Sequence, residues 1–252
     1  MKMPELWCDV ELPLSIVARC GGYYECPKDD KGKRLGPLVG YAGKDAQGRQ
    51  KVGDVYINFA KVEQWPALVT GFAHLLKDEL ENRFDGQRLD SEKLVFVGMP
   101  MGGIVLATHL ALQKHGSRGI FAEKAGEELV LKRHDLNPGD QAVIVEDVCN
   151  NFSTTTKAVN LIKKAGAEVI AVACFLNRSE KTALNLYANP FWPKEKPDIV
   201  LPVISLVHKP FPQYEQEDSA VADDVVAGNV VWKPKHEWDK LSGAMALPKV
   251  QI

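Results

Sequence analysis

Residues 143–155 read Val-Ile-Val-Glu-Asp-Val-Cys-Asn-Asn-Phe-Ser-Thr-Thr. The apolar residues 143–145 predict a buried strand that ends at two carboxylates, Glu146 and Asp147, before a polar turn and a helix through Ala158. Adjacent carboxylates can accept hydrogen bonds from a vicinal diol, and the backbone amides at a helix start suit a phosphate dianion. The stretch therefore predicts a sugar-phosphate site at the carboxyl edge of a parallel sheet.

The polar turn supplies the candidate phosphate-binding residues Asn150, Asn151, Phe152, Ser153, Thr154 and Thr155. A plainer interpretation is a solvated strand end followed by an ordinary helix N-cap at Ser153 or Thr154. The rest of the chain favours a ligand site, because a second turn of the same kind precedes this one.

That second turn follows the apolar residues 94–97 and leads into a helix expected over 104–114. It contains three glycines and one proline in six residues, so backbone amides are exposed at a second helix start. The candidate anion-binding residues are Met99, Pro100, Met101, Gly102 and Gly103. Taken alone, the segment is also consistent with a simple tight turn.

Both turns resemble those of the type I phosphoribosyltransferases. Glu146, Asp147 and Val148 match the Glu-Asp-Val of the orotate branch, and residues 98–103 keep the Gly-x-Pro-x-Gly-Gly form of its pyrophosphate loop. The phosphate turn departs from this pattern, with Phe152 where Gly is usual and Asn where Thr or Ser is usual. Because Asn tolerates left-handed geometry, we interpret the turn as rebuilt.

Cationic side chains between the two turns fit the same resemblance. Glycine and charge at 123–128 suggest a hairpin tip. Lys124 matches a cationic position of the catalytic loop, and Lys132 with Arg133 resembles an Arg-Arg pair that closes over pyrophosphate. That pair is usually followed by Gly-Phe, whereas this chain has His-Asp. The alternative is a solvated hairpin whose charges serve no ligand.

Two further residues gain a role only through the resemblance. Arg178 follows the strand expected over 169–176, at a place where the family carries Asp-Arg and where the Arg is associated with the orotate carboxylate. An arginine fork suits a planar carboxylate. Lys61 ends a segment similar to the Tyr-Ile-Asp-x-Arg/Lys element beside the base pocket. The plainer interpretation of Arg178 is a helix-start residue paired with Glu180. That of Lys61 is a surface lysine.

Composition is that of a soluble enzyme with one substantial core. The chain has 252 residues and a net charge of −2, which gives no electrostatic reason to expect nucleic acid or an anionic membrane as partner. No apolar run is long enough to span a bilayer, and the first residues do not resemble a signal peptide, so we expect a cytoplasmic location. Five cysteines without a Cys-x-x-Cys pair argue against zinc or a disulfide framework, and we expect Cys149 to serve packing.

The chain reads as three parts. Residues 1–60 carry glycines, prolines and short alternating runs typical of hairpins, and form a small lid or hood. Residues 61–207 alternate helices and strands, which predicts an α/β core with a central parallel sheet flanked by helices. By the resemblance, this is the type I phosphoribosyltransferase fold. Residues 208–252 are irregular and aromatic, and we expect an arm packed on the lid, the core or a partner subunit.

The resemblance implies transfer of ribose-5-phosphate from phosphoribosyl pyrophosphate to a nitrogen base, with orotate, a pyrimidine precursor, the first choice. It also implies Mg²⁺ bound through the pyrophosphate, no metal site of the protein's own, and a homodimer. Glu146 and Asp147 would hold the ribose diol and stabilise the charge that develops as pyrophosphate leaves. The alternatives are a non-catalytic nucleotide-binding regulator with this fold, or a transferase for a different base.

Overall fold

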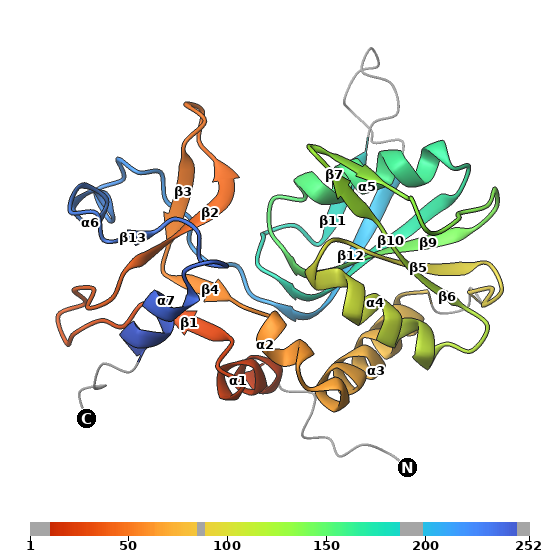
Figure 1. Cartoon of the computed structure of the whole chain (residues 1–252), viewed down its shortest axis with the longest axis horizontal. Helices are drawn as coiled ribbons and strands as arrows, with labels where there is room; N and C mark the ends of the chain where they lie inside the picture. Colours follow the sequence, from red (N-terminus) through yellow and green to blue (C-terminus); the bar gives the residue numbers. More distant parts are fainter. Residues whose placement is uncertain (1–10, 85–88, 187–198, 246–252) are drawn as a thin grey trace. The chain divides into compact units, whose positions relative to one another are not determined.

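The computed structural model describes residues 11–84, 89–186 and 199–245. The chain divides into two compact units. We call Met1–Pro13 with Glu63–Pro210 the core unit, and Leu14–Val62 with Phe211–Ile252 the small unit. Figure 1 colours both along the chain, and each is described by itself below.

A mostly parallel sheet forms the centre of the core unit. Its strands in the described residues are β5 (Leu94–Gly98), β6 (Arg118–Phe121), β9 (Gln141–Cys149), β10 (Glu168–Asn177), β11 (Ala183–Leu186) and β12 (Ile199–His208). Their order across the sheet is β11-β12-β10-β9-β5-β6, and every pair is parallel except β11 with β12. The predicted α/β core with a central parallel sheet is confirmed.

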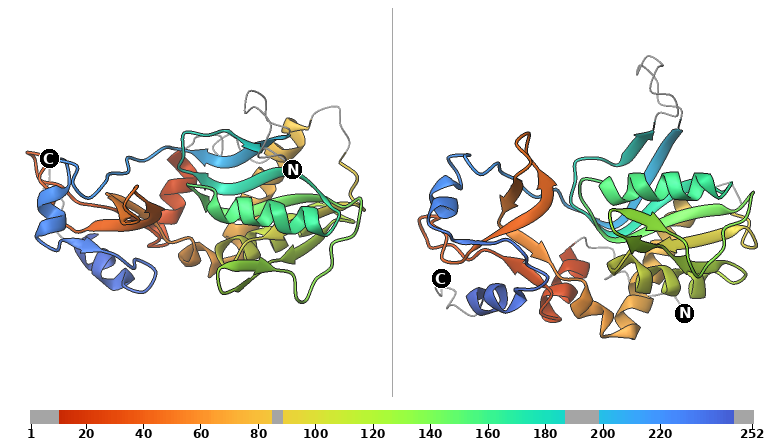
Figure 2. Two further views of the ribbon diagram at one scale, coloured as in Figure 1. Left: turned by 90° about the horizontal axis from the view of Figure 1, so that it is seen from above. Right: turned by 45° about the horizontal axis from the view of Figure 1, so that its top comes forward.

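Helices cover both faces of this sheet (Figures 1 and 2). They are α3 (Pro66–Arg83), α4 (Gly102–Gln113) and α5 (Ser153–Lys164). Ile162 of α5 belongs to one hydrophobic cluster with Ile144 and Cys174, whereas the next strand residue, Phe175, meets Phe72 of α3 at 4.9 Å between ring centroids. Alternate strand residues thus serve opposite faces, which explains the continuous apolar runs in the sequence. No helix in the described ranges has the length and apolar character needed to cross a membrane.

The charged segment after β6 is a hairpin, as predicted. Strands β7 (Glu123–Ala125) and β8 (Glu128–Val130) pair antiparallel, and Gly126 takes a positive φ of 64° in the turn between them. Leu129 packs against the hydrophobic cluster under α5. Lys157 of α5 donates a hydrogen bond from Nζ to the backbone oxygen of Glu127 at 2.6 Å. The hairpin therefore rests against the helix that follows the acidic strand end.

The small unit combines a segment near the start of the chain with the C-terminal segment. It contains β1 (Tyr23–Glu25), β2 (Leu38–Lys44), β3 (Gln50–Gly53), β4 (Val55–Ile57), α6 (Ala222–Val226), β13 (Val230–Val231) and α7 (Trp238–Met245), while α1 (Glu11–Arg19) and α2 (Ala60–Glu63) each cross a boundary between the units. β13 pairs parallel with β2, and Trp238 and Leu241 of α7 share a buried cluster with Tyr24 of β1.

The C-terminal segment is therefore part of the small unit and no separate arm. Of the placements expected for it, the structure shows packing on the lid segments, with β13 as an added strand. The physical reason is that the first four residues of β2, 38–41, are all buried, and its backbone needs a hydrogen-bonded neighbour along each edge. The C-terminal segment supplies that neighbour on one side. The chain passes between the two units after residues 13, 62 and 210.

An ion-pair network ties the chain ends together inside the small unit. Arg34 donates from Nε to Asp54 Oδ1 at 2.6 Å and from Nη1 to Asp224 Oδ2 at 3.2 Å, and Lys28 Nζ lies 2.9 Å from Asp54 Oδ2. Burial opposes ionisation of Asp54, but the hydrogen bonds from Arg34 and Lys28 outweigh it and hold the pKa of Asp54 below its usual value.

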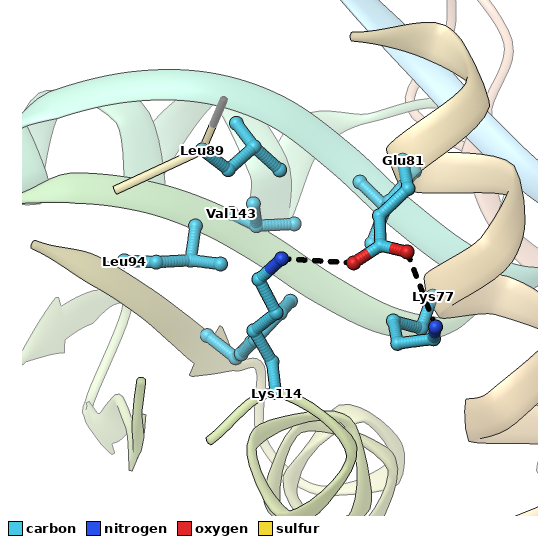
Figure 3. Close-up of a pocket in the computed structure, with 8 residues that line it drawn as sticks. Lys77, Glu81, Leu89, Leu94, Lys114 and Val143 are labelled. Atoms are coloured by element: carbon cyan, nitrogen blue, oxygen red, sulfur yellow. Dashed lines mark hydrogen bonds and ion pairs between the residues drawn. The ribbon is translucent and has the colours of Figure 1, made fainter. Parts of the chain in front are cut away.

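A small apolar cavity lies under α3 at the start of β5 (Figure 3). Leu94 and Val143 line it, and Glu81 accepts hydrogen bonds from Lys114 at 2.8 Å and Lys77 at 3.1 Å beside it. The hydrogen bond from Lys114 lowers the pKa of Glu81. With a volume of about 10 Å³, the cavity has room for about one water molecule and none for a substrate.

The Asp54 network gives a stability prediction. We expect Asp54→Asn to lower the free energy of unfolding at pH 7 by about 2 kcal/mol, because Arg34 keeps a half-buried charge without its strongest partner. A carboxylate with a lowered pKa stabilises the fold above its unfolded pKa of about 3.9 and loses this effect as pH falls through the folded value. The difference between variant and unmodified chain should therefore shrink in acid. Urea unfolding at several pH values measures it.

Asp30→Asn, on an exposed side chain of the same unit, is the matched control and should change stability little. Equal stability of the Asp54 variant and this control at pH 7 would contradict the structural role of the network.

Candidate functional site

The turn after β5 lies beside the acidic part of β9 at the carboxyl edge of the core sheet. β5 and β9 are parallel neighbours with Gly98 opposite Val145, and the backbone N–H of Met99 donates to the oxygen of Val145 at 2.9 Å. The chain after β5 is the turn at residues 99–103, and the chain after Val145 begins with the two acids. The two segments therefore meet at this edge of the sheet.

The turn after β5 is closed by its own backbone. Gly103 N–H donates to Met99 O at 3.0 Å, and Ile104 N–H donates to Met101 O at 3.2 Å. The peptide between Pro100 and Met101 is cis, and the side chain of Met101 is 78% exposed. A Cβ atom at Gly103 would collide with the carbonyl oxygen of Val145. Glycine is needed there because the turn touches the neighbouring strand.

Asp147 lies directly against this turn. A Cβ atom on Gly102 would collide with the carboxylate of Asp147, so the missing side chain is what lets the carboxylate approach the start of α4. Both Glu146 and Asp147 are half-buried. Asp147 and the turn thus form one surface, with the start of α4 on one side and a carboxylate on the other. Such a surface offers both donors and acceptors to a ligand.

The turn after β9 is rebuilt around Phe152. This residue has a φ of 58° and a ψ of 18°, the left-handed conformation that Gly adopts most easily, and its side chain is only 6% exposed within the hydrophobic cluster. The ring therefore points into the core and does not fill the mouth of the turn. Asn151 Oδ1 accepts hydrogen bonds from Ser153 N at 3.1 Å and Ser153 Oγ at 3.0 Å. These bonds shape the turn without Gly.

The hydroxyl side chains beyond Phe152 are not equivalent. Ser153 is exposed and Thr154 half-buried, whereas Thr155 is 2% exposed. Ser153 and Thr154 are therefore the hydroxyls at the surface of the turn, and the side chain of Thr155 belongs to the interior.

Cys149 is a packing residue at the end of β9, as expected. Its side chain is buried in the hydrophobic cluster. A hydrogen bond with Cys174 and burial raise the pKa of the Cys149 thiol well above its usual value, and so keep it protonated. A protonated, buried thiol is a poor nucleophile.

The candidate cations of the hairpin are not in contact with the two turns. Lys124 and Lys132 are exposed, and neither side chain has a hydrogen bond or ion pair with any residue that the structure describes. Arg133 Nε lies 3.4 Å from Glu123 Oε1 at the base of the hairpin, with the Arg133 side chain 69% exposed. These residues have the geometry of the solvated hairpin, and their approach to a ligand stays a prediction.

Arg178 lies beside the end of β9. Its backbone N–H donates to Cys149 O at 2.9 Å, and the residue is 5% exposed. The segment after it bends and leads to β11, so Arg178 does not start a helix. The residue before it, Asn177, is 1% exposed and makes several hydrogen bonds, yet sequence analysis did not select it. Its Asn-for-Asp difference from the family was the available signal. Lys61 lies on α2 in the small unit, half-buried.

The geometry of Phe152 gives a second stability prediction. We expect Phe152→Gly to relieve about 1 kcal/mol of left-handed strain but to lose about 3–5 kcal/mol of aromatic packing, for a net loss of about 2–4 kcal/mol. Phe152→Leu keeps the strain and part of the packing, and should lose less. Urea unfolding measures both variants. A Phe152→Gly chain more stable than the unmodified one would mean that the ring contributes little to the core.

Comparison with known proteins identifies the family. A family model described as "Phosphoribosyl transferase domain" matches residues 59–194, more than half of the chain. A curated protein named orotate phosphoribosyltransferase from Caldanaerobacter subterraneus is 30% identical over 169 residues, covering 67% of this chain and 77% of its own length. Another of the same name, from Thermoanaerobacter, is 28% identical over 58% of this chain and 78% of its own.

Solved structures similar to this chain include two enzymes. The orotate phosphoribosyltransferase of Aeropyrum pernix has a TM-score of 0.47 and 16% identity, and the match covers 77% of this chain and 92% of that one. An adenine phosphoribosyltransferase from Saccharomyces cerevisiae has a TM-score of 0.46 and 18% identity, covering 68% of this chain and 94% of that one. On the family model and the curated relatives, this chain belongs to the phosphoribosyltransferase family.

Proposed function

We propose that this protein transfers ribose-5-phosphate from phosphoribosyl pyrophosphate to orotate. The observation that carries the proposal is the contact between Asp147 and Gly102, which joins the paired acids and the glycine turn into one surface. That surface suits a ligand with a diol between two phosphorylated ends. The names of the curated relatives support orotate as the base.

In the proposed mechanism the acids act on the ribose. Glu146 and Asp147 accept hydrogen bonds from the two ring hydroxyls and hold negative charge close to the anomeric carbon. As the bond from that carbon to pyrophosphate breaks, positive charge develops on the ring, and fixed carboxylates stabilise it more than they stabilise the ground state. A base nitrogen then forms the new bond. The products are a nucleoside monophosphate and pyrophosphate.

The two turns hold the phosphates. The turn at 150–155 would bind the 5-phosphate through backbone amides at the start of α5, with Ser153 and Thr154 as the hydroxyl donors. Because the Phe152 ring packs in the core, it leaves this surface open. Residues 99–103 would bind pyrophosphate, with Lys124, Lys132 and Arg133 as its cationic partners.

In this proposal Mg²⁺ enters the site bound to the pyrophosphate of the substrate. Within the described residues, no group of three or more His, Cys, Asp or Glu side chains could hold a metal ion. The two carboxylates nevertheless offer the oxygen donors that Mg²⁺ prefers, and it commonly binds through one or two carboxylates and substrate phosphates. When bound, it would neutralise charge on the leaving pyrophosphate.

Arg178 is the proposed contact for the base. It lies next to the end of β9, and its guanidinium can donate two parallel hydrogen bonds to a carboxylate such as that of orotate. The proposed function is tested by calorimetric titration with phosphoribosyl pyrophosphate and Mg²⁺, followed by a spectroscopic assay with orotate. Binding with turnover supports it. Binding without turnover favours the regulator, and turnover only with adenine or another base favours a different transferase.

Gly102→Ala tests the central contact. We expect it to weaken phosphoribosyl pyrophosphate by at least about tenfold, because the added methyl group must displace Asp147 or the start of α4. Gly71→Ala on α3 is the matched control, since nothing lies within 4 Å of its added methyl. It should keep binding and gain about 0.5–1 kcal/mol of stability. Unchanged binding by the Gly102 variant would show that the contact between Gly102 and Asp147 is not part of the binding site.

Asp147→Asn tests the charge. Turnover should fall by about 10²–10³-fold, because the amide keeps the shape but loses the charge that stabilises the oxocarbenium-like state. The thermal midpoint should stay near that of the unmodified chain. Asp30→Asn serves as the control for turnover as well. Full activity in Asp147→Asn would reject the assigned role.

A further inference from the structure

The segment that carries Arg178 is held by the side chain of the preceding residue. Asn177 Nδ2 donates to Lys181 O at 2.7 Å, and Oδ1 accepts hydrogen bonds from Ser179 N at 3.1 Å and Ser179 Oγ at 2.8 Å. Both ends of the amide are thus used, one as donor and one as acceptor. The Asn177 side chain closes residues 177–181 into a compact loop with Arg178 in it.

Neighbouring strands fix the same loop from outside. His208, the last residue of β12, donates from Nε2 to Ser179 O at 2.9 Å. Lys209 N–H donates to Asn177 O at 3.0 Å, and Arg178 N–H donates to Cys149 O at 2.9 Å. The loop is therefore bonded to the ends of both neighbours of β10. Inside the loop, Ser179 Oγ also accepts a hydrogen bond from Lys181 N at 3.1 Å and lies 3.4 Å from Lys181 O. Asn177 is the residue whose side chain reaches both Ser179 and Lys181 from the end of β10.

We propose that Asn177 is a positioning residue for base recognition, and that its amide group is required to present Arg178 to the base. This inference rests on the proposed function, in which Arg178 meets the carboxylate of orotate. Asn177 touches neither substrate. It acts by fixing the backbone from which the guanidinium extends.

The chemistry of the amide decides this role. An Asp at position 177, the residue that the resembled family carries there, would keep the acceptor for Ser179 but would have no donor for the Lys181 oxygen. Two oxygen atoms at that distance repel each other, and in a site that is 1% exposed no bulk water can relieve the contact. The loop would then open, and Arg178 would move with it.

The test compares Asn177→Asp with Asn185→Asp, the same change at an exposed position of β11. Arg178→Ala shows how much orotate affinity is lost when the guanidinium is removed entirely. Calorimetry measures orotate and phosphoribosyl pyrophosphate binding in the full-length protein. We expect Asn177→Asp to weaken orotate by about tenfold and phosphoribosyl pyrophosphate by less than about twofold, with Asn185→Asp unchanged. Hydrogen exchange should become faster at residues 178–181 in Asn177→Asp only.

Unchanged orotate affinity in Asn177→Asp, or equal weakening of both ligands, overturns the inference. If that variant does not fold, Ser179→Ala replaces it, since it removes the hydroxyl bond to the Asn177 amide together with the contacts of Oγ with Lys181. It should weaken orotate by about two- to fivefold and leave phosphoribosyl pyrophosphate unchanged, and no change in orotate affinity overturns the inference. If the unmodified chain fails to bind orotate, the proposed function is rejected. In that case hydrogen exchange alone tests whether Asn177 holds the loop. Equal exchange rates at residues 178–181 in Asn177→Asp and Asn185→Asp overturn this role.

Discussion

The parallel pairing of β5 and β9 is the constraint on which the candidate site depends. Its register sets Gly98, the last residue of β5, opposite Val145, so the turn after β5 lies beside Glu146 and Asp147, which still belong to β9. The hydrogen bond from Met99 N–H to Val145 O extends the pairing one step beyond the strand. A slip of one residue would turn the side chains of the strand to opposite faces and separate Asp147 from Gly102.

Close backbone approach restricts the residues at this edge. Gly102 and Gly103 leave no space for a methyl group, because the Asp147 carboxylate and the Val145 carbonyl occupy it. Phe152 shows the opposite solution at the second turn. There the left-handed backbone is kept without glycine, and burial of the ring offsets the strain. The two turns thus meet different constraints, one through absent side chains that allow close approach and one through a well-packed side chain in a left-handed conformation.

The small unit illustrates a different constraint. One edge of β2 has no hydrogen-bonded neighbour until the chain returns from the core unit and β13 pairs with it. The same returning segment packs α7 against β1. The Arg34 network then fixes that return through Asp54 and Asp224. Because these contacts join residues 24–54 to residues 224–241, the small unit is complete only once the C-terminal segment is in place.

Much of the core could be predicted from the sequence. The apolar runs that became β5, β9 and β10, the glycine turn after β5 and the acid pair within β9 are visible because strand burial and turn chemistry depend on neighbouring residues. The placement of the C-terminal segment was not visible in the same way. Its short strand, Val230–Val231, has too few residues for a periodic signal, and only its partner β2 makes it a strand.

By itself, then, the sequence determined the order of the elements, the α/β class and the residues of the two turns, since each of these is a local property of the chain. Only the tertiary structure decided that Phe152 points into the core, that Asp147 touches Gly102, and that Asn177 holds the loop of Arg178. Local sequence allows several side-chain directions at each of these positions. Packing between distant segments leaves room for one of them.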